Sequence, residues 1–521
     1  MLVDTINEIK KDDIIVKNEI ADNLKSKKIN KNPSFFRRFF ALFIPSALQN
    51  LAIVIIFFVN NIFLSQLSSA HADAKTAVGL ANPIINFVLF IILAWSGGLS
   101  IMMGQYYGSK EHNKNQELTV FGFAASFVLY IPFMILILVI PNQLINLISG
   151  FEIGKAGKEI IEYSTMYLRI MVLSFIPFIF VEIMSTGFQT TNKSVIPLYS
   201  VIVNLVFNLV FVLVSIILTK DDPLLSIILV CVIDIIAKIF QALFLFLYII
   251  IKKYEPINFF RKIKFEKDVI KKCLKYAAPS FFNDVLFSIF LLIQSFALLN
   301  YSNNVLQINW IENNNQAFGN IQEATTNVNV LIEFTGVIWP GMSAATAVMV
   351  GNSLGAGNIK EAKENSKKCL FWSFIISLSI ILILFGASWF INDLLNHGSK
   401  PWMNKLAKYM EWALLPIILS QGIFSVIIFS IRTGGSKIIV VCDALVLGIS
   451  SVIMLILTLC GVMQYMNPVV YIFILQMDQI IRMVISIFMY KYYNWAKNLT
   501  QDNNEIKVTK VEVQNSSEEL I

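Results

Sequence analysis

Two similar stretches open the two hydrophobic halves of this 521-residue chain. The first half begins with Ile44-Pro45-Ser46-Ala47-Leu48-Gln49-Asn50, and the second begins with Ala278-Pro279-Ser280-Phe281-Phe282-Asn283-Asp284. Each stretch starts a block, 38–251 and 273–493, that reads as six membrane-spanning segments. A six-helix unit inserted twice in the same orientation gives two facing lobes with a site between them, an arrangement typical of transporters.

The composition excludes an ordinary soluble domain. Hydrophobic residues make up 56% of the chain and charged residues only 14%, whereas a soluble domain carries about 25% charged residues. Runs of about 20 apolar residues recur along the chain, and each is long enough to cross the bilayer as a helix. The sequence therefore predicts an all-α integral membrane protein with twelve transmembrane helices in two pseudo-symmetric six-helix lobes.

The predicted spans of the first lobe cover 38–64, 77–105, 117–140, 160–188, 194–219 and 223–251. Those of the second lobe cover 273–300, 323–353, 368–392, 402–431, 437–461 and 466–493. With the N-terminus inside, this map places most of the 41 Lys and Arg residues on the cytoplasmic side, as the positive-inside rule requires. We therefore expect a multi-pass protein of the cell membrane with both termini cytoplasmic.

Three polar segments flank these blocks. We expect a flexible cytoplasmic leader at 1–37, a basic cytoplasmic linker between the lobes at 252–272 and a polar, disordered tail at 494–521. The formal net charge of +7 gathers next to the spans, which favours contact with anionic lipid headgroups over nucleic acid. Neither a zinc site nor a disulfide framework is indicated, because the five cysteines form no CxxC pair.

Two further pairs of stretches support the duplication. Gly104-Gln105-Tyr106-Tyr107-Gly108 follows the second span, and Gly351-Asn352-Ser353-Leu354-Gly355 follows the eighth. Each places glycines at a helix end, where left-handed caps favour them. The fourth and tenth spans also close alike, at 188–193 and 431–436.

The stretch 351–364 reads Gly-Asn-Ser-Leu-Gly-Ala-Gly-Asn-Ile-Lys-Glu-Ala-Lys-Glu, and 77–84 reads Ala-Val-Gly-Leu-Ala-Asn-Pro-Ile. They resemble the glycine-rich turn and the second-span opening of the MATE (multidrug and toxic compound extrusion) transporters. The resemblance covers nearly all of 38–493. It implies a secondary active transporter that exports organic, often cationic or amphipathic compounds by antiport with H⁺ or Na⁺, through alternating access between the lobes.

Four acids within the spans are candidates for ion coupling or substrate binding, because a charge inside the bilayer is costly without a function or a partner. Asp284 is the first candidate, since its own span offers no basic residue nearby. Glu333 is the second, and Asp443 is the third, with structural pairing between helices equally favoured for Asp443. For Glu182 we weigh a functional role evenly against pairing across helices.

Amides replace acids at several positions that the resemblance marks. Many members carry an aspartate near the end of the first span, where this chain has Asn60, and one branch has an acid at the position of Asn208. Gln421 stands where some relatives have an acid. An amide oxygen can coordinate Na⁺, but the amide cannot give up a proton in this range. These three side chains, with Gln49, Asn50 and Asn204, either line a polar cavity or hydrogen-bond helices together.

Several charged residues in the spans favour a structural reading. Asp234 and Lys238, and likewise Asp478 and Arg482, are four residues apart, so each pair is expected to neutralise itself locally. Arg432 closes a predicted cytoplasmic helix end, where a headgroup or the helix dipole would hold it.

The sequence thus favours an antiporter that needs no cofactor beyond the coupling ion and acts as a monomer on small-molecule substrates. The alternative is a flippase for a lipid-linked precursor or polysaccharide, which would need a cavity lined with cations, and the spans hold few. An enzyme is disfavoured because the chain has no HExxH or GxSxG motif.

Overall fold

The computed structural model describes residues 34–66, 71–149, 158–218, 222–259, 264–304, 328, 335–389 and 401–500. Within these ranges every regular element is a helix. Eleven of the described segments are long and apolar enough to cross a membrane. The remaining predicted span, 323–353, is represented by α12 (Ile338–Gly355), ahead of which the chain is only partly described. The predicted all-helical membrane fold is confirmed.

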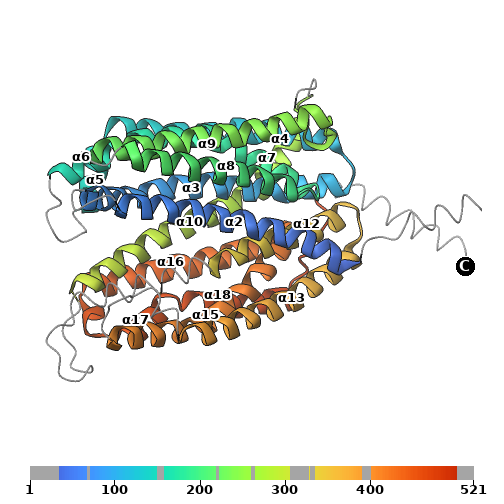
Figure 1. The fold of residues 1–521 in the computed structure, drawn as a ribbon. Coiled ribbons are helices and arrows are strands. Elements are labelled where there is room, and N and C mark those ends of the chain that lie inside the picture. Colours follow the sequence, from blue (N-terminus) through green and yellow to red (C-terminus); the bar gives the residue numbers. More distant parts are fainter. Residues whose placement is uncertain are drawn as a thin grey trace, which may run out of the picture.

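The helices before residue 260 gather in one half of the bundle, which we call the N-lobe, and those after residue 264 gather in the other half, the C-lobe (Figure 1). The N-lobe consists of α2 (Phe35–Gln66), α3 (His71–Gly108), α4 (His112–Val139), α5 (Pro141–Ser149), α6 (Lys158–Met171), α7 (Phe175–Thr190), α8 (Val195–Leu218) and α9 (Pro223–Lys252), with short 3₁₀ turns η1 (Val172–Ser174) and η2 (Glu255–Ile257).

The C-lobe consists of α10 (Lys267–Asn304), α12, α13 (Ile359–Ala387), α15 (Pro401–Thr433), α16 (Lys437–Leu459), α17 (Pro468–Leu475) and α18 (Asp478–Tyr492), with a 3₁₀ turn η3 (Val462–Tyr465). Most boundaries fall within a few residues of the predicted spans. Two spans are interrupted rather than continuous: the fourth breaks at η1, and the twelfth breaks between α17 and α18.

Local sequence fixes several helix ends. Asp222 caps α9 by accepting a hydrogen bond from the Leu225 amide at 3.1 Å, with Pro223 in the first turn, which suits a residue that lacks an N–H. Asn358 caps α13 by accepting from the Glu361 amide at 3.1 Å. These caps satisfy amides that a helix start leaves without partners.

The lobes meet at the end of the molecule where α3 and α12 finish, and they diverge toward α5 and α17 (Figure 1). The two repeated glycine stretches form this contact. A side-chain carbon on Gly108 would clash with the backbone of Asn352, and one on Gly355 would clash with the carbonyl group of Gln105. The duplicated stretches thus pack against each other, and their glycines permit an approach that a larger residue would prevent.

Residues 494–500 also lie in this contact, which differs from the disordered tail that we expected. Trp495 packs in the C-lobe core at 3% exposure, whereas Leu499 packs in the N-lobe core at 6% exposure. The Gln105 side chain donates to the Thr433 carbonyl oxygen at 2.6 Å and accepts from the Leu499 amide at 2.6 Å. Buried apolar side chains and paired amides hold this short segment between the lobes.

Candidate functional site

A cavity of about 800 Å³ lies between the lobes. Helices α2, α3, α6, α7, α8 and α9 of the N-lobe and α10, α12, α15 and α18 of the C-lobe contribute to its walls. Five of the candidate residues line it together with Asp284: Gln49, Asn50, Glu182, Asn204 and Gln421. Its charged lining residues are Glu182, Asp234, Lys238, Asp284, Arg432 and Arg482.

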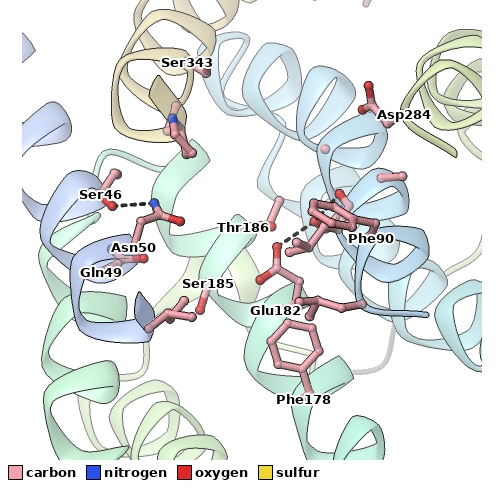
Figure 2. A pocket seen from close by; sticks show the side chains of 18 of the residues that line it. Ser46, Gln49, Asn50, Phe90, Phe178, Glu182, Ser185, Thr186, Asp284 and Ser343 are labelled. Atoms are coloured by element: carbon pink, nitrogen blue, oxygen red, sulfur yellow. Dashed lines mark hydrogen bonds between the residues drawn. The ribbon is translucent and has the colours of Figure 1, made fainter. Parts of the chain in front are cut away.

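Glu182 extends from α7 into this cavity, beside Ser185 and Thr186 of the same helix (Figure 2). The hydroxyl group of Ser96 on α3 donates to Glu182 Oε1 at 2.7 Å. In the part of the chain that the structure describes, no basic nitrogen lies within 4.0 Å of the Glu182 carboxylate. Pairing of Glu182 with a cation across helices, one of the two readings that we weighed, is therefore not seen here.

The second acid of the N-lobe wall is paired as the sequence predicts. Lys238 Nζ lies 2.6 Å from Asp234 Oδ2, one helical turn earlier on α9, and also donates to the Ser174 hydroxyl at 3.2 Å. The rings of Phe175 and Phe178 lie 5.9 and 5.7 Å from the same ammonium group. This pair neutralises itself and leaves Glu182 as the uncompensated charge of the N-lobe wall.

Some of the N-lobe amides join separate elements, and others bond within their own helix. Gln49 donates to the Ser194 carbonyl at 2.9 Å, and Asn50 donates to the Ser46 carbonyl at 2.8 Å (Figure 2). Asn204 donates to Gln241 on α9 at 2.7 Å and accepts from Asn208 at 2.6 Å. Asn208 lies behind the wall, since it does not line the cavity. Bonds between helices and exposure to the cavity coexist in this group, so both readings of the amides hold in part.

Asp284 corrects the principal sequence prediction. We expected a carboxylate without a basic neighbour, but Arg432 reaches it from α15 with two hydrogen bonds, of 2.8 and 3.1 Å. Arg432 is only 7% exposed and lines the cavity, so it is not the headgroup or dipole contact that we expected at a helix end. The α15 helix continues to Thr433 inside the protein, which brings the guanidinium group to α10.

Asp443 lies behind the cavity wall in a buried charge network. Arg482 contacts its two carboxylate oxygens at 2.6 and 3.1 Å, and Asn283 donates to it at 2.7 Å. Arg432 is also 3.9 Å from Asp443. Of the two readings of Asp443, the contacts match pairing between helices.

The expected local pair of Asp478 and Arg482 is present, but it is the more distant of the two ion pairs that Arg482 makes. Arg482 Nη1 lies 3.7 Å from Asp478, with no hydrogen bond between them. The guanidinium group is bonded to Asp443 instead, because α16 packs beside α18 and presents that acid closer.

One turn of α3 separates the acids of the two lobes (Figure 2). Ser96 hydrogen-bonds Glu182 on the N-lobe side. A side-chain carbon on the next residue, Gly97, would lie 3.9 Å from Asp284 Oδ2 on the C-lobe side. Neighbouring positions of one helix therefore face the two acids, with a serine that bonds Glu182 and a glycine that leaves space beside Asp284. The remaining candidates, Glu333 and the side chain of Asn60, lie outside the described residues.

Sequence reasoning missed the cavity-facing cations Arg432 and Arg482 and the role of Ser96. Arg432 gave a weak signal, because it sits at the very end of a predicted span. Its partner Asp284 lies 148 residues before it, and its second neighbour, Asp443, lies on the next helix. Spacing along the sequence therefore could not reveal either contact.

A bundle of helices long enough to span a membrane, around a cavity between two lobes, is the architecture typical of membrane transporters. A family model described as MatE matches residues 45–214 and 324–457, more than half of the chain. The chain therefore belongs to the MatE family, whose members are transporters and not enzymes.

Comparisons with known proteins agree with this assignment. A probable multidrug resistance protein, YoeA of Bacillus subtilis (strain 168), is 22% identical over 318 residues, and the match spans 60% of this chain and 64% of that relative, just under two thirds of its length. A multidrug resistance MATE family transporter of the MOP superfamily, described in an outward-facing conformation, has a TM-score of 0.69 at 13% identity and matches 87% of this chain and 94% of its own.

A second solved structure is described as a MOP superfamily transporter from Pyrococcus furiosus Vc1 (DSM3638) whose binding pocket has reverse polarity. It has a TM-score of 0.70 at 13% identity, with 89% of this chain and 96% of that chain covered. The eukaryotic MATE transporter AtDTX14 has a TM-score of 0.70 at 14% identity, with 89% and 97% covered. At these identities the likeness shows the fold alone.

Proposed function

We propose that this protein exports organic, cationic or amphipathic compounds across the cell membrane by antiport with H⁺ or Na⁺. The observation that carries the proposal is Glu182, an uncompensated acid on the wall of a cavity of about 800 Å³. A buried carboxylate without a cation is costly in the membrane interior. A bound H⁺ or Na⁺, or the positive charge of a substrate, stabilises it, so the two compete for one acid.

The contact between the lobes supports alternating access. The positive-inside rule makes the end that contains Gly108, Gly355 and residues 494–500 the cytoplasmic end. The lobes touch there and diverge at the opposite end, which supports an outward-facing state. Release of cargo outside and uptake inside require that the glycine contact opens and closes in each cycle.

The lining residues disfavour the flippase alternative. Each cation of the cavity wall already has a carboxylate oxygen close by: Lys238 at 2.6 Å, Arg432 at 2.8 Å and Arg482 at 2.6 Å. A phosphate group would have to displace these acids. The cavity offers a free acid rather than a free cation, which suits a positively charged substrate.

The test is efflux of ethidium from proteoliposomes under separately imposed proton and sodium gradients. We expect the wild-type protein to respond to one gradient and Glu182→Gln to lose that response. The matched control is Glu162→Gln, which removes the same charge from an exposed position of α6 outside the cavity. Gradient-driven efflux by Glu182→Gln at the wild-type rate would refute the role of this acid.

A second pair of variants tests alternating access. In Gly355→Ala the added methyl group clashes with Gln105, whereas in Gly448→Ala on α16 it meets no neighbour within 4 Å. Both add the same methyl group to a helix, where alanine is favoured over glycine by about 1 kcal/mol. We expect transport to be lost only in Gly355→Ala, and equal transport by both would show that the glycine contact need not form.

A further inference from the structure

The twelfth span breaks in the middle of its length. Helix α17 ends at Leu475 and α18 begins at Asp478, ten residues after Pro468 and fourteen before Tyr492. The carbonyl oxygen of Leu475 accepts a hydrogen bond from the Gln294 side chain at 2.8 Å. Interrupted helices at membrane depth occur where protein or a cavity covers the freed backbone, and they often border ion sites.

Asp478 stands at this break with its carboxylate poorly satisfied. It is 4% exposed, and neither carboxylate oxygen accepts a hydrogen bond of good geometry, although the adjacent backbone amides of Asp478 and Gln479 approach it. The neighbouring cation, Arg482, keeps its Nη1 3.7 Å away while its Nε and Nη2 bond Asp443. A buried carboxylate in this state is costly, because it has lost its water and gained little in return.

The charges around Asp478 do not balance. Helix α10 contributes Asp284, α15 contributes Arg432, and α16 contributes Asp443; α18 contributes Arg482 together with Asp478 itself. Three carboxylates thus share two guanidinium groups, so the network carries one surplus negative charge when all are ionised. Asp284 and Asp443 are hydrogen-bonded to arginine, which leaves Asp478 as the acid with the surplus.

We propose that Asp478 is a binding site for one monovalent cation, H⁺ or Na⁺, in the C-lobe. This inference rests on the proposed cation-coupled transport and adds a second cation site to that of Glu182. Asn283, which donates to Asp443 and is 1% exposed, has a carbonyl oxygen that also accepts no hydrogen bond. A carboxylate can take up H⁺ or coordinate Na⁺, and an amide oxygen can coordinate Na⁺.

Cation binding at Asp478 affects the cavity because it changes the interactions of Arg482. With a cation on Asp478, Arg482 interacts with Asp443 alone. Without the cation, the charged Asp478 attracts the same guanidinium group, which lines the cavity and lies 4.3 Å from the Phe424 ring centroid. The cation therefore sets the position of a charged group that substrate would meet.

The test measures cation binding apart from transport, on full-length protein in nanodiscs. Calorimetry counts protons taken up on acidification and Na⁺ bound at fixed pH. We expect Glu182→Gln to retain one cation-binding group, and Glu182→Gln with Asp478→Asn to lose it. Asparagine has the same shape and removes the surplus charge, so the double variant is expected to fold. Adding Glu162→Gln in place of Asp478→Asn is the matched control.

The ion is identified in the same experiment, because uptake on acidification in the absence of Na⁺ indicates H⁺ and saturable Na⁺ binding at constant pH indicates Na⁺. Failure of Glu182→Gln to bind either ion overturns the proposal, even if no Asp478 variant folds. Unchanged binding in the double variant also overturns it. Failure of the proposed function is a separate result, namely wild-type efflux that responds to neither gradient.

Discussion

Near the cavity, the carboxylates of each lobe outnumber its cations by one. The two lobes differ in how this extra carboxylate is surrounded. In the N-lobe, Asp234 and Lys238 form a separate pair, and Glu182 stands alone with a hydroxyl donor. In the C-lobe, Asp284 and Asp443 share Arg432 and Arg482 in one network, with Asp478 at its edge. The two lobes thus carry different electrostatics.

The difference indicates a division of roles. A network that bonds four helices of the C-lobe, α10, α15, α16 and α18, ties that lobe together, and breaking one of its members leaves another charge buried without a partner. Glu182 of the N-lobe interacts with the hydroxyl groups of Ser96 and Thr186 rather than with a cation, so removal of its charge leaves no uncompensated partner. The C-lobe network is expected to govern stability, and Glu182 is expected to govern coupling.

The largest effect is expected from Asp443→Asn. It leaves Arg482 without its two closest carboxylate oxygens, and loss of one partner of a buried ion pair costs about 3–5 kcal/mol. Urea or thermal unfolding in nanodiscs measures the loss. A variant as stable as the wild type would end the claim that the network ties the C-lobe together.

A smaller loss is expected from Leu499→Ala, which removes the side chain that joins the C-terminal segment to the N-lobe core. Truncation of a buried leucine costs about 2–5 kcal/mol, and we expect the lower end because the site lies at the edge of the bundle. The same change should favour separation of the lobes at this end. Spin labels at positions 113 and 360 would then report longer distances between the lobes than in the protein with Leu499. An unchanged distance distribution would show that residues 494–500 do not hold the lobes together.

The next effect in size is the coupling energy between Asp234 and Lys238, measured by a double-mutant cycle with Asp234→Asn and Lys238→Met. Removing both partners should cost less than the two single changes added together, with a coupling of about 1–2 kcal/mol, because close ionic partners interact by 0.5–3 kcal/mol. Unfolding free energies of the four proteins give the coupling. Strict additivity would mean that the pair contributes nothing, and that Lys238 is available to Glu182 or to substrate.

The smallest effect on stability is expected from Glu182→Gln, at less than about 1 kcal/mol. The amide oxygen can accept the same hydrogen bond from Ser96, and the net contribution of such a bond to the free energy of unfolding is about 1 kcal/mol. The same variant should lose gradient-driven efflux. A large loss of stability with unchanged efflux would reverse the roles assigned to the two lobes.

The fold was accessible from the sequence to a large extent. The lengths of the apolar runs and the placement of Lys and Arg predicted the spans, because lipid demands long helices with closed backbone hydrogen bonds. The repeated stretches at 104–108 and 351–355 were recognised as a duplication, but their packing against each other was not foreseen. Residues 494–500 were expected to be disordered, since composition alone does not show that Trp495 and Leu499 reach two different cores.

The candidate site was predicted only in part. Local spacing identified the Asp234–Lys238 pair, because both partners lie on one helix. It failed for Asp284, whose partner Arg432 comes from α15. It identified the pair of Asp478 and Arg482, but not the closer bonds of Arg482 to Asp443.

The sequence by itself therefore determined that this chain spans a membrane as two related sets of helices, because hydrophobicity and charge placement act along the chain. Only the tertiary structure decided how the buried acids share the available cations, because partners of buried charges come from helices far apart in sequence. That distribution, with Glu182 facing the cavity and Asp478 at a broken helix, follows from how the helices pack.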